Sequence, residues 1–426
     1  MNKFYGCYLL LLILFLVLTS CGITHQLKSE LKKNQKETTF FKGFVLYDPV
    51  KKKGLINHNG SSYFTPASNT KLYTFYTAYR TFTDSVKSLA YIRAKDSLII
   101  KGTADPSLLY YGIDSTKVIN FLKNEQDSIY LVDAGIDETP YGSGWAWDDY
   151  QYYYMPEKSL FPIYGNLLTY TAFNDSIIST PSFFMKDITV LDSIVITREL
   201  TSNTFYLARN ANERYEYEVP FITSNMLVVE LLGKEIHKKI NIIPDQKNYD
   251  FSFLHSLSYD DLYKQMLVVS DNFIAEQLLL QVGKKVADSY SVEAAIEYSL
   301  EHYLQELPQA PRWVDGSGLS RYNLFSPNDM VFLLEKMYQE IPRQKLLDYF
   351  PVGGETGTLK NWYANEKPFV YAKSGTLSNN YNLSGYLVTK KGKLLIFSYM
   401  NNHYKISTAE IKKEVERTLK KIYNAY

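Results

Sequence analysis

The stretch PASNTKLY, from Pro66 to Tyr73, decides how this sequence is interpreted. Ser68 stands three residues before Lys71, where an apolar pattern with helical spacing begins. Residues three apart share one face of a helix, so the lysine amine can reach the serine hydroxyl. A serine at a helix start is by default an N-cap, and the same spacing recurs at Ser29 and Lys32 in a polar segment. The rest of the chain must therefore decide between a cap and a nucleophile.

Two further motifs accompany this stretch. The triplet Ser270-Asp271-Asn272 joins two helical patterns. Lys373-Ser374-Gly375 lies in the first of three successive strand patterns, which are expected to be antiparallel neighbours and which precede the C-terminal helical pattern. Each is weak alone, because Ser270 fits a turn and Lys373 fits a solvated lysine on an edge strand. S-x-x-K, S-D-N and K-T-G are together the signature of penicillin-binding proteins and class A β-lactamases, so their joint occurrence favours chemistry.

The first motif supplies a nucleophile and its base. A serine hydroxyl attacks a carbonyl efficiently only when a base takes its proton. A lysine is a base near neutral pH only if its ammonium form is disfavoured, which burial and a second nearby cation would achieve. We therefore expect Ser68 to be acylated, Lys71 to be its base and Lys373 to be the second cation. The backbone N–H of Ser68 is expected to help hold an oxyanion.

The other motif residues are expected to contact the substrate. Ser270 would relay protons toward the leaving amine, and Asn272 would hold a substrate amide. A peptide can lie along the Lys373 strand as an added strand. Lys373 and Ser374 would then meet its carboxylate, and the N–H of Thr376 would be the second oxyanion donor.

The chain resembles the low-molecular-mass class C penicillin-binding proteins, the D-alanyl-D-alanine carboxypeptidases/endopeptidases. The resemblance covers nearly all of Phe40 to Tyr404 and includes the three motifs. The third motif departs from the family pattern, because Ser374 replaces a threonine but keeps its hydroxyl. The resemblance also rests on IKGTADPSLL, GWAWDD (Gly144 to Asp149), VDGSGLSRYNLFSP (Val314 to Pro327) and FPVGGETGTL.

The resemblance implies an α/β transpeptidase-like fold, shared with serine β-lactamases, in which helices flank an antiparallel sheet. A change to short strand patterns near Asp96 agrees with a mostly-β domain inserted at 96–217 into a catalytic domain of 40–95 and 218–426. The implied activity is a penicillin-sensitive serine DD-peptidase that acts on peptidoglycan stem peptides through an acyl-enzyme on Ser68. Asp149 would lie near the pocket for the free amine end of the stem, although an aspartate there is more often only solvated.

The N-terminus indicates export. Lys3 is followed by an apolar run from Tyr8 to Leu18, which is shorter than the roughly 20 residues of a spanning helix and typical of a secretory signal. LTSC, ending at Cys21, resembles a bacterial lipoprotein signal. We expect a signal peptide at 1–20, lipidation of Cys21 and a polar tether at 21–39; a plain signal anchor is the alternative. The absence of an acidic residue after Cys21 suggests, by resemblance, outer-membrane anchoring with the domain in the periplasm.

Composition narrows the partners. Lysine and arginine number 46 against 45 acidic residues, with no basic block, so no nucleic-acid partner is expected. The six histidines include no HxxxH pair, so no metal or other cofactor is expected. Stem peptides and inhibitory β-lactams are the expected ligands. A β-lactamase or esterase would need a further base for deacylation, which the sequence does not name. A non-catalytic wall-binding lipoprotein would be favoured by loss of a motif residue, and none is lost.

Overall fold

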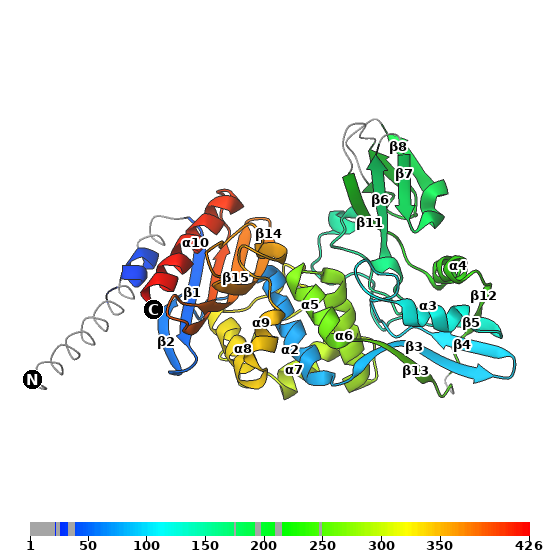
Figure 1. Ribbon diagram of the computed structural model, residues 1–426, viewed down its shortest axis with the longest axis horizontal. Coiled ribbons are helices and arrows are strands. Elements are labelled where there is room, and N and C mark those ends of the chain that lie inside the picture. Colours follow the sequence, from blue (N-terminus) through cyan, green and yellow to red (C-terminus); the bar gives the residue numbers. More distant parts are fainter. Residues whose placement is uncertain are drawn as a thin grey trace, which may run out of the picture.

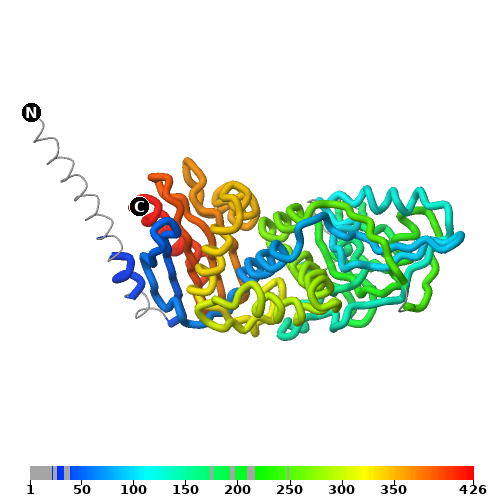
Figure 2. The backbone as a smooth tube through the Cα atoms, turned by 90° about the horizontal axis from the view of Figure 1, so that it is seen from below, coloured from blue at the N-terminus to red at the C-terminus, as the bar shows by residue number. Residues whose placement is uncertain are grey.

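The structure is a computed structural model that shows two lobes joined by a helical middle (Figures 1 and 2). The first lobe contains both the first strands of the chain and the C-terminal helix, and the second is formed by the middle of the chain. The predicted signal peptide (1–20) and the predicted lipidation site Cys21 lie outside the described residues. The structure describes residues 22, 26–32, 39–173, 176–191, 197–208, 215–246 and 249–426.

The first lobe is built on a five-stranded antiparallel sheet in the order β14-β15-β16-β1-β2. Three strands that follow one another near the C-terminus pair as antiparallel neighbours, as the sequence predicts. Strand β1 pairs with β16, so a segment from the start of the domain lies beside a segment near the C-terminus. The strands are β1 (Phe41–Asp48), β2 (Lys53–His58), β14 (Val370–Leu377), β15 (Asn380–Val388) and β16 (Leu394–Asn402).

Helices cover both faces of this sheet, which confirms the predicted fold class. Successive strand residues point to opposite faces, so Phe44 and Leu46 pack in the cluster beside α10, and Val45 packs on the other side. The apolar stripe of α10 is buried as its 3.6-residue period predicts. The helices are α2 (Lys71–Thr81), α5 (Tyr259–Val268), α6 (Asn272–Ala287), α7 (Val292–His302), α8 (Pro327–Glu340), α9 (Arg343–Asp348) and α10 (Thr408–Ala425).

The second lobe contains a mixed sheet in the order β12-β5-β4-β3-β13. Its strands β3, β12 and β13 lie outside the predicted 96–217, so the insertion extends further at both ends than the sequence indicates. The local sequence pattern of a strand does not show which distant strand pairs with it. The elements are β3 (Ser85–Ala94), β4 (Ser97–Lys101), β5 (Ser128–Asp133), β12 (Ile240–Pro244), β13 (Ser252–Ser258), α3 (Thr116–Lys123) and α4 (Asn225–Ile236).

Two smaller three-stranded sheets complete the second lobe, in agreement with a mostly-β insertion. A proline suits the first turn of a helix, and the sequence around Pro220 suggests one there. Pro220 instead ends the strand β11. The next helix, α4, begins later, with Ser224 as its N-cap. The strands are β6 (Leu167–Phe173), β7 (Ser176–Thr180), β8 (Ile188–Leu191), β9 (Thr197–Arg198), β10 (Phe205–Ala208) and β11 (Tyr215–Pro220).

Residues 26–32, in the predicted tether, form a helix that lies beside α10 (Figure 1). Leu27 and Leu31 are buried in the same cluster as the α10 stripe, and Glu30 forms an ion pair with Lys421 at 2.7 Å. This part of the predicted tether therefore packs on the domain instead of standing free of it. Among the described residues no helix has the length and apolarity needed to cross a membrane.

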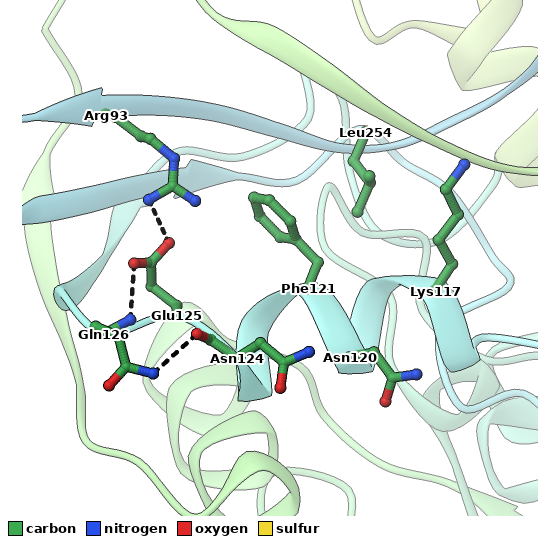
Figure 3. A pocket seen from close by; sticks show the side chains of 8 residues that line it. All are labelled: Arg93, Lys117, Asn120, Phe121, Asn124, Glu125, Gln126 and Leu254. Atoms are coloured by element: carbon green, nitrogen blue, oxygen red, sulfur yellow. Dashed lines mark hydrogen bonds and ion pairs between the residues drawn. The ribbon is translucent and has the colours of Figure 1, made fainter.

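A pocket in the second lobe lies between α3 and the strands β3 and β13 (Figure 3). Arg93 and Glu125 form an ion pair at its edge, and the ring of Phe121 faces Arg93. None of the motif residues lines this pocket. This pocket is therefore separate from the site that the three motifs predict.

Candidate active site

Ser68 lies in a short 3-10 turn, η1 (Ala67–Thr70), that leads directly into α2. The N-cap positions of η1 and α2 belong to Pro66 and Thr70, and no side chain caps either helix. The alternative in which Ser68 is only an N-cap is therefore wrong. Thr70 instead closes the turn by donating its hydroxyl to the carbonyl of Ala67 at 2.9 Å.

Lys71 is fully buried at the start of α2 and faces three oxygen atoms. Its Nζ lies 3.1 Å from Ser68 Oγ, 2.6 Å from Asn272 Oδ1 and 2.7 Å from the carbonyl oxygen of Ser317. A neutral amine has two N–H groups and one lone pair. Asn272 Oδ1 and the Ser317 carbonyl oxygen can accept only, so they take the two N–H groups and leave the lone pair for the Ser68 hydroxyl. The arrangement therefore suits a lysine that acts as a base.

Burial also lowers the pKa of Lys71, to about 8. Three carboxylates, those of Asp315, Asp271 and Glu276, oppose this effect because they stabilise the ammonium. The expected repulsion between the two lysines acts on the other partner: burial, followed by the charge of Lys71, lowers the pKa of Lys373 well below its usual value. Burial, and not a second cation, is thus the main reason that Lys71 can be present as the neutral amine that a base requires.

The second and third motifs meet across the site. Lys373 on β14 is fully buried and donates from Nζ to Ser270 Oγ and to the carbonyl of Ser374, each at 2.7 Å. It is therefore not a solvated edge lysine. Ser270 has a φ of +66°, a left-handed conformation that a serine rarely adopts. Ser374 Oγ donates to Thr358 Oγ1 at 2.8 Å.

Two tyrosines of the inserted segment hold the S-D-N motif. Asp271 caps α6 by accepting from the N–H of Ile274 at 2.9 Å, and it also accepts from the hydroxyl of Tyr110 at 2.6 Å. Asn272 donates its amide to the carbonyl of Tyr154 at 2.8 Å while its oxygen accepts from Lys71. The insertion is therefore part of the site's framework.

Gly375 allows β14 to approach the nucleophile turn, which is the turn η1 that carries the predicted nucleophile Ser68. A Cβ at this position would lie 2.4 Å from the carbonyl oxygen of Pro66, which is closer than any real contact. Asn69 then fastens the turn to the strand by donating to the carbonyl of Lys373 at 3.1 Å. The glycine of the third motif is thus required by packing.

The outer edge of β14 is oriented as an oxyanion donor and a peptide binding site require. In an antiparallel strand, alternate residues direct their N–H groups to the same edge. Ala372 donates to the carbonyl of Pro351 at the outer edge at 3.3 Å, and the pairing with β15 is regular from Val370 to Leu377. The N–H of Thr376 therefore faces the open edge, where this side chain is exposed.

Asp149 lies near the site but not at its centre. It is half-buried in the 3-10 turn η2 (Trp147–Gln151). Burial and then the Asp149 carboxylate, which accepts from the Tyr154 hydroxyl, raise the pKa of Tyr154. Tyr154 in turn contacts Asn272, so Asp149 is one residue away from the second motif.

The structure adds residues whose roles sequence reasoning missed. Asp315, in the quoted DGSGLS stretch, accepts from the N–H groups of Gly318 and Ser320 at 2.9 and 2.6 Å and from Trp145 Nε1 at 2.9 Å. The stretch therefore forms a rigid loop beside the nucleophile turn. The DGSGLS motif can be recognised in the sequence. The segments that its loop contacts cannot be, because the packing of distant parts of the chain sets those contacts.

Gly318 offers a test of this packing. Its φ is +82°, and a Cβ would lie 1.9 Å from the carbonyl oxygen of Ala67. We expect Gly318→Ala to lower the free energy of unfolding by about 3 kcal/mol or more and to abolish labelling by penicillin, because the turn that carries Ser68 must move. Urea unfolding and fluorescent-penicillin labelling measure both effects.

Gly392 is the matched control for Gly318. It has nearly the same φ, +79°, but has no atom within 4 Å of its added Cβ. Gly392→Ala should cost only the conformational strain of about 1–2 kcal/mol and keep full labelling. Equal effects of the two substitutions would show that the close approach to Ala67 is unimportant.

Comparisons with known proteins agree with this geometry. The model of the D-Ala-D-Ala carboxypeptidase 3 (S13) family matches residues 23–183 and 229–423. The chain is 25% identical to penicillin-sensitive carboxypeptidase A of Dictyostelium discoideum, covering 76% of this chain and 74% of that protein. It is 30% identical to D-alanyl-D-alanine carboxypeptidase DacB of Haemophilus influenzae over 44% of this chain and 40% of that protein.

Solved structures show the same fold. Penicillin binding protein 4 of Haemophilus influenzae superposes with a TM-score of 0.71 at 20% identity, covering 90% of this chain and 97% of that one. A predatory peptidoglycan endopeptidase of Bdellovibrio bacteriovorus superposes with a TM-score of 0.52 at 16% identity, covering 91% and 93%. The fold is therefore shared over nearly the whole of each chain.

Proposed function

Because the chain belongs to the D-Ala-D-Ala carboxypeptidase 3 (S13) family, we propose that its Ser68 is the residue acylated when it cleaves D-alanyl-D-alanine bonds. It is a serine DD-peptidase and a low-molecular-mass class C penicillin-binding protein. The observation that carries the assignment of Ser68 is the contact of its Oγ with a buried lysine whose other two contacts are both acceptors.

Acylation proceeds in the following way. Ser68 Oγ bonds to the carbonyl carbon of the penultimate D-alanine while its proton passes to Lys71 Nζ. The backbone N–H groups of Ser68 and Thr376 hold the oxyanion. The C–N bond then breaks, and the leaving amine takes a proton through Ser270, which contacts Lys373 Nζ at 2.7 Å. Water later hydrolyses the ester and frees Ser68.

The substrate binds along the part of the outer β14 edge that follows Ala372. A stem peptide adds there as a strand, with its terminal carboxylate at Lys373 and Ser374 and its amide at Asn272. A carboxylate at Lys373 stabilises the ammonium form that burial disfavours. Gly375 keeps the strand close to the nucleophile. Asp149 is proposed, from the family resemblance, to lie near the pocket for the free amine end of the stem.

Defined muropeptides test this proposal and resolve the leaving group. A carboxypeptidase releases free D-alanine from a pentapeptide, and an endopeptidase separates a cross-linked dimer into monomers. We expect mass spectrometry to detect at least one of these products with purified protein and neither after Ser68→Ala. Binding to sacculi without either product would instead favour a non-catalytic wall-binding protein.

We propose that the protein lies in the periplasm and is anchored by acyl chains on Cys21. Analysis of the mature N-terminus can detect this modification. The apolar run before Cys21 and the LTSC sequence support this proposal. Two or more acyl chains on one cysteine hold a protein stably on a membrane. Cys21→Ala should leave the protein without acyl mass and in the soluble fraction of cells. An unchanged mass and distribution would refute lipidation, and outer-membrane anchoring requires that the wild type fractionate with that membrane.

A further inference from the structure

The loop that begins at Asp315 is wedged between the helices that carry the first two motifs. The carbonyl of Ser317 accepts from Lys71 Nζ at 2.7 Å, and the carbonyl of Gly316 accepts from Thr74 Oγ1 at 2.6 Å. Gly318 packs directly on the nucleophile turn. The position of the Ser317 carbonyl therefore determines which way the Lys71 amine is turned.

Glu276 holds this loop from the opposite side. It is 1% exposed and lies one turn after Asn272 on α6, so both side chains face the loop. One carboxylate oxygen accepts from the N–H of Gly316 at 3.1 Å, and the other accepts from the N–H of Ser317 at 2.7 Å. Both oxygens are used as acceptors, an arrangement that the ionised carboxylate satisfies with its lone pairs alone.

Charged groups from the loop, the insertion and α2 interact with this carboxylate. Burial raises the pKa of Glu276, and Asp315 on the loop raises it further, whereas Lys158 from the insertion lowers it. On α2, the Lys71 ammonium is stabilised by Glu276 and by Asp271 and Asp315. Glu276 is thus linked to Lys71 in two ways, through the hydrogen-bonded loop and through the attraction between their charges.

We propose that Glu276 is a positioning residue for acylation: its carboxylate holds the Gly316–Ser317 backbone so that the Ser317 carbonyl fixes the Lys71 amine toward Ser68. The proposal rests on the proposed roles of Ser68 and Lys71. It differs from a purely structural role, because Glu276 brings a negative charge close to the base as well as two hydrogen bonds.

The consequence for pH dependence follows from the sign of that charge. Only the neutral Lys71 amine accepts the Ser68 proton, so the acylation rate rises with pH through the pKa of Lys71. The Glu276 carboxylate stabilises the ammonium and raises this pKa. Removal of the charge must therefore move the acid limb of the pH–rate profile to lower pH.

The test compares Glu276→Gln with Glu276→Asp. Penicillin acylation of Ser68 is measured by stopped-flow or labelling between about pH 6 and pH 9.5, a window on both sides of the wild-type limb. Glutamine has only one acceptor oxygen, so its NH2 group faces the other backbone N–H and cannot accept from it. We expect a plateau rate lower by roughly 10- to 100-fold, the range for one hydrogen bond to a charged group, and a midpoint at lower pH. Aspartate keeps the charge but reaches only one N–H, so its rate falls while its midpoint stays.

Glu157→Gln is the matched control. Glu157 is also buried and accepts from a backbone N–H, that of Thr223 at 2.8 Å, but it lies in the insertion away from Lys71. Its variant should keep the wild-type rate and midpoint. Circular dichroism and thermal unfolding show whether each variant folds.

Each result has a defined meaning. An unchanged midpoint in Glu276→Gln, even with a lower rate, would show that the residue is only structural and would overturn the proposal. If Glu276→Gln does not fold, Glu276→Asp decides, because a wild-type rate in that variant would refute the positioning role. A wild type that penicillin does not acylate would refute the proposed function itself, which distinguishes the two failures.

Discussion

Replacing Ser68 with alanine is expected to abolish covalent labelling by penicillin, with a loss of at least about 10⁴-fold in acylation rate. The physical reason is that Ser68 Oγ is the hydroxyl in contact with Lys71, at 3.1 Å, so no other group receives the benefit of this base. The loss should not reflect unfolding. Ser68 is only half-buried, and its side chain caps no helix. Thermal unfolding of the variant should therefore match the wild type closely.

The chain provides its own control for this experiment. Ser29 has a lysine at the same spacing, Lys32, but both side chains are exposed in the short helix of residues 26–32. Ser29→Ala should leave labelling unchanged. Labelling of the Ser68→Ala variant at the wild-type rate would refute the assignment. Rapid release of hydrolysed penicillin by the wild type would identify a β-lactamase on this scaffold, whereas we expect a long-lived adduct.

Replacing Lys71 with glutamine is expected to slow acylation by roughly 10²- to 10⁴-fold, the usual contribution of a general base. In the wild type, the rate should rise as pH increases through about 8, because burial lowers the pKa of Lys71 to that value and only the neutral amine accepts a proton. In the variant, this rise should disappear, because glutamine does not titrate.

Acylation rates measured against pH separate the base from a structural contact. Lys32→Gln is the control, since Lys32 is exposed and should not alter the profile. Retention of the rise near pH 8 in Lys71→Gln would assign the titration to another group. In that case Lys373, whose pKa is lowered by burial and by Lys71, would be the next residue to test.

The sequence predicted the site because its residues lie at fixed local spacings. Ser68 and Lys71 are three residues apart, and helix geometry alone brings them together. The strands near the C-terminus were equally local, so their antiparallel order was predictable and is confirmed. The catalytic roles of these residues stay predictions, but the structure places Lys71 against Asn272 and Lys373 against Ser270.

Only the tertiary structure decided what depends on contacts between distant segments. The insertion begins before residue 96 and ends after residue 217, because β3 pairs with β13 from the far side of the insertion. The helix at residues 26–32 packs against α10, which no local pattern reveals. Desolvation has the same origin: the pKa of Lys71 is lowered by atoms from several elements that surround it.

The sequence by itself thus determined the family resemblance and predicted the nucleophile and its neighbour one turn away, since each depends on short spacings. The tertiary structure decided why this neighbour is suited to act as a base. Lys71 is suited to that role because the Ser317 carbonyl oxygen and Asn272 Oδ1 occupy its N–H groups in a buried space. Gly318 and Glu276 make that space possible, the first by allowing close approach and the second by holding the loop. Burial and acceptor geometry are properties of the packed chain, so no spacing along the sequence encodes them.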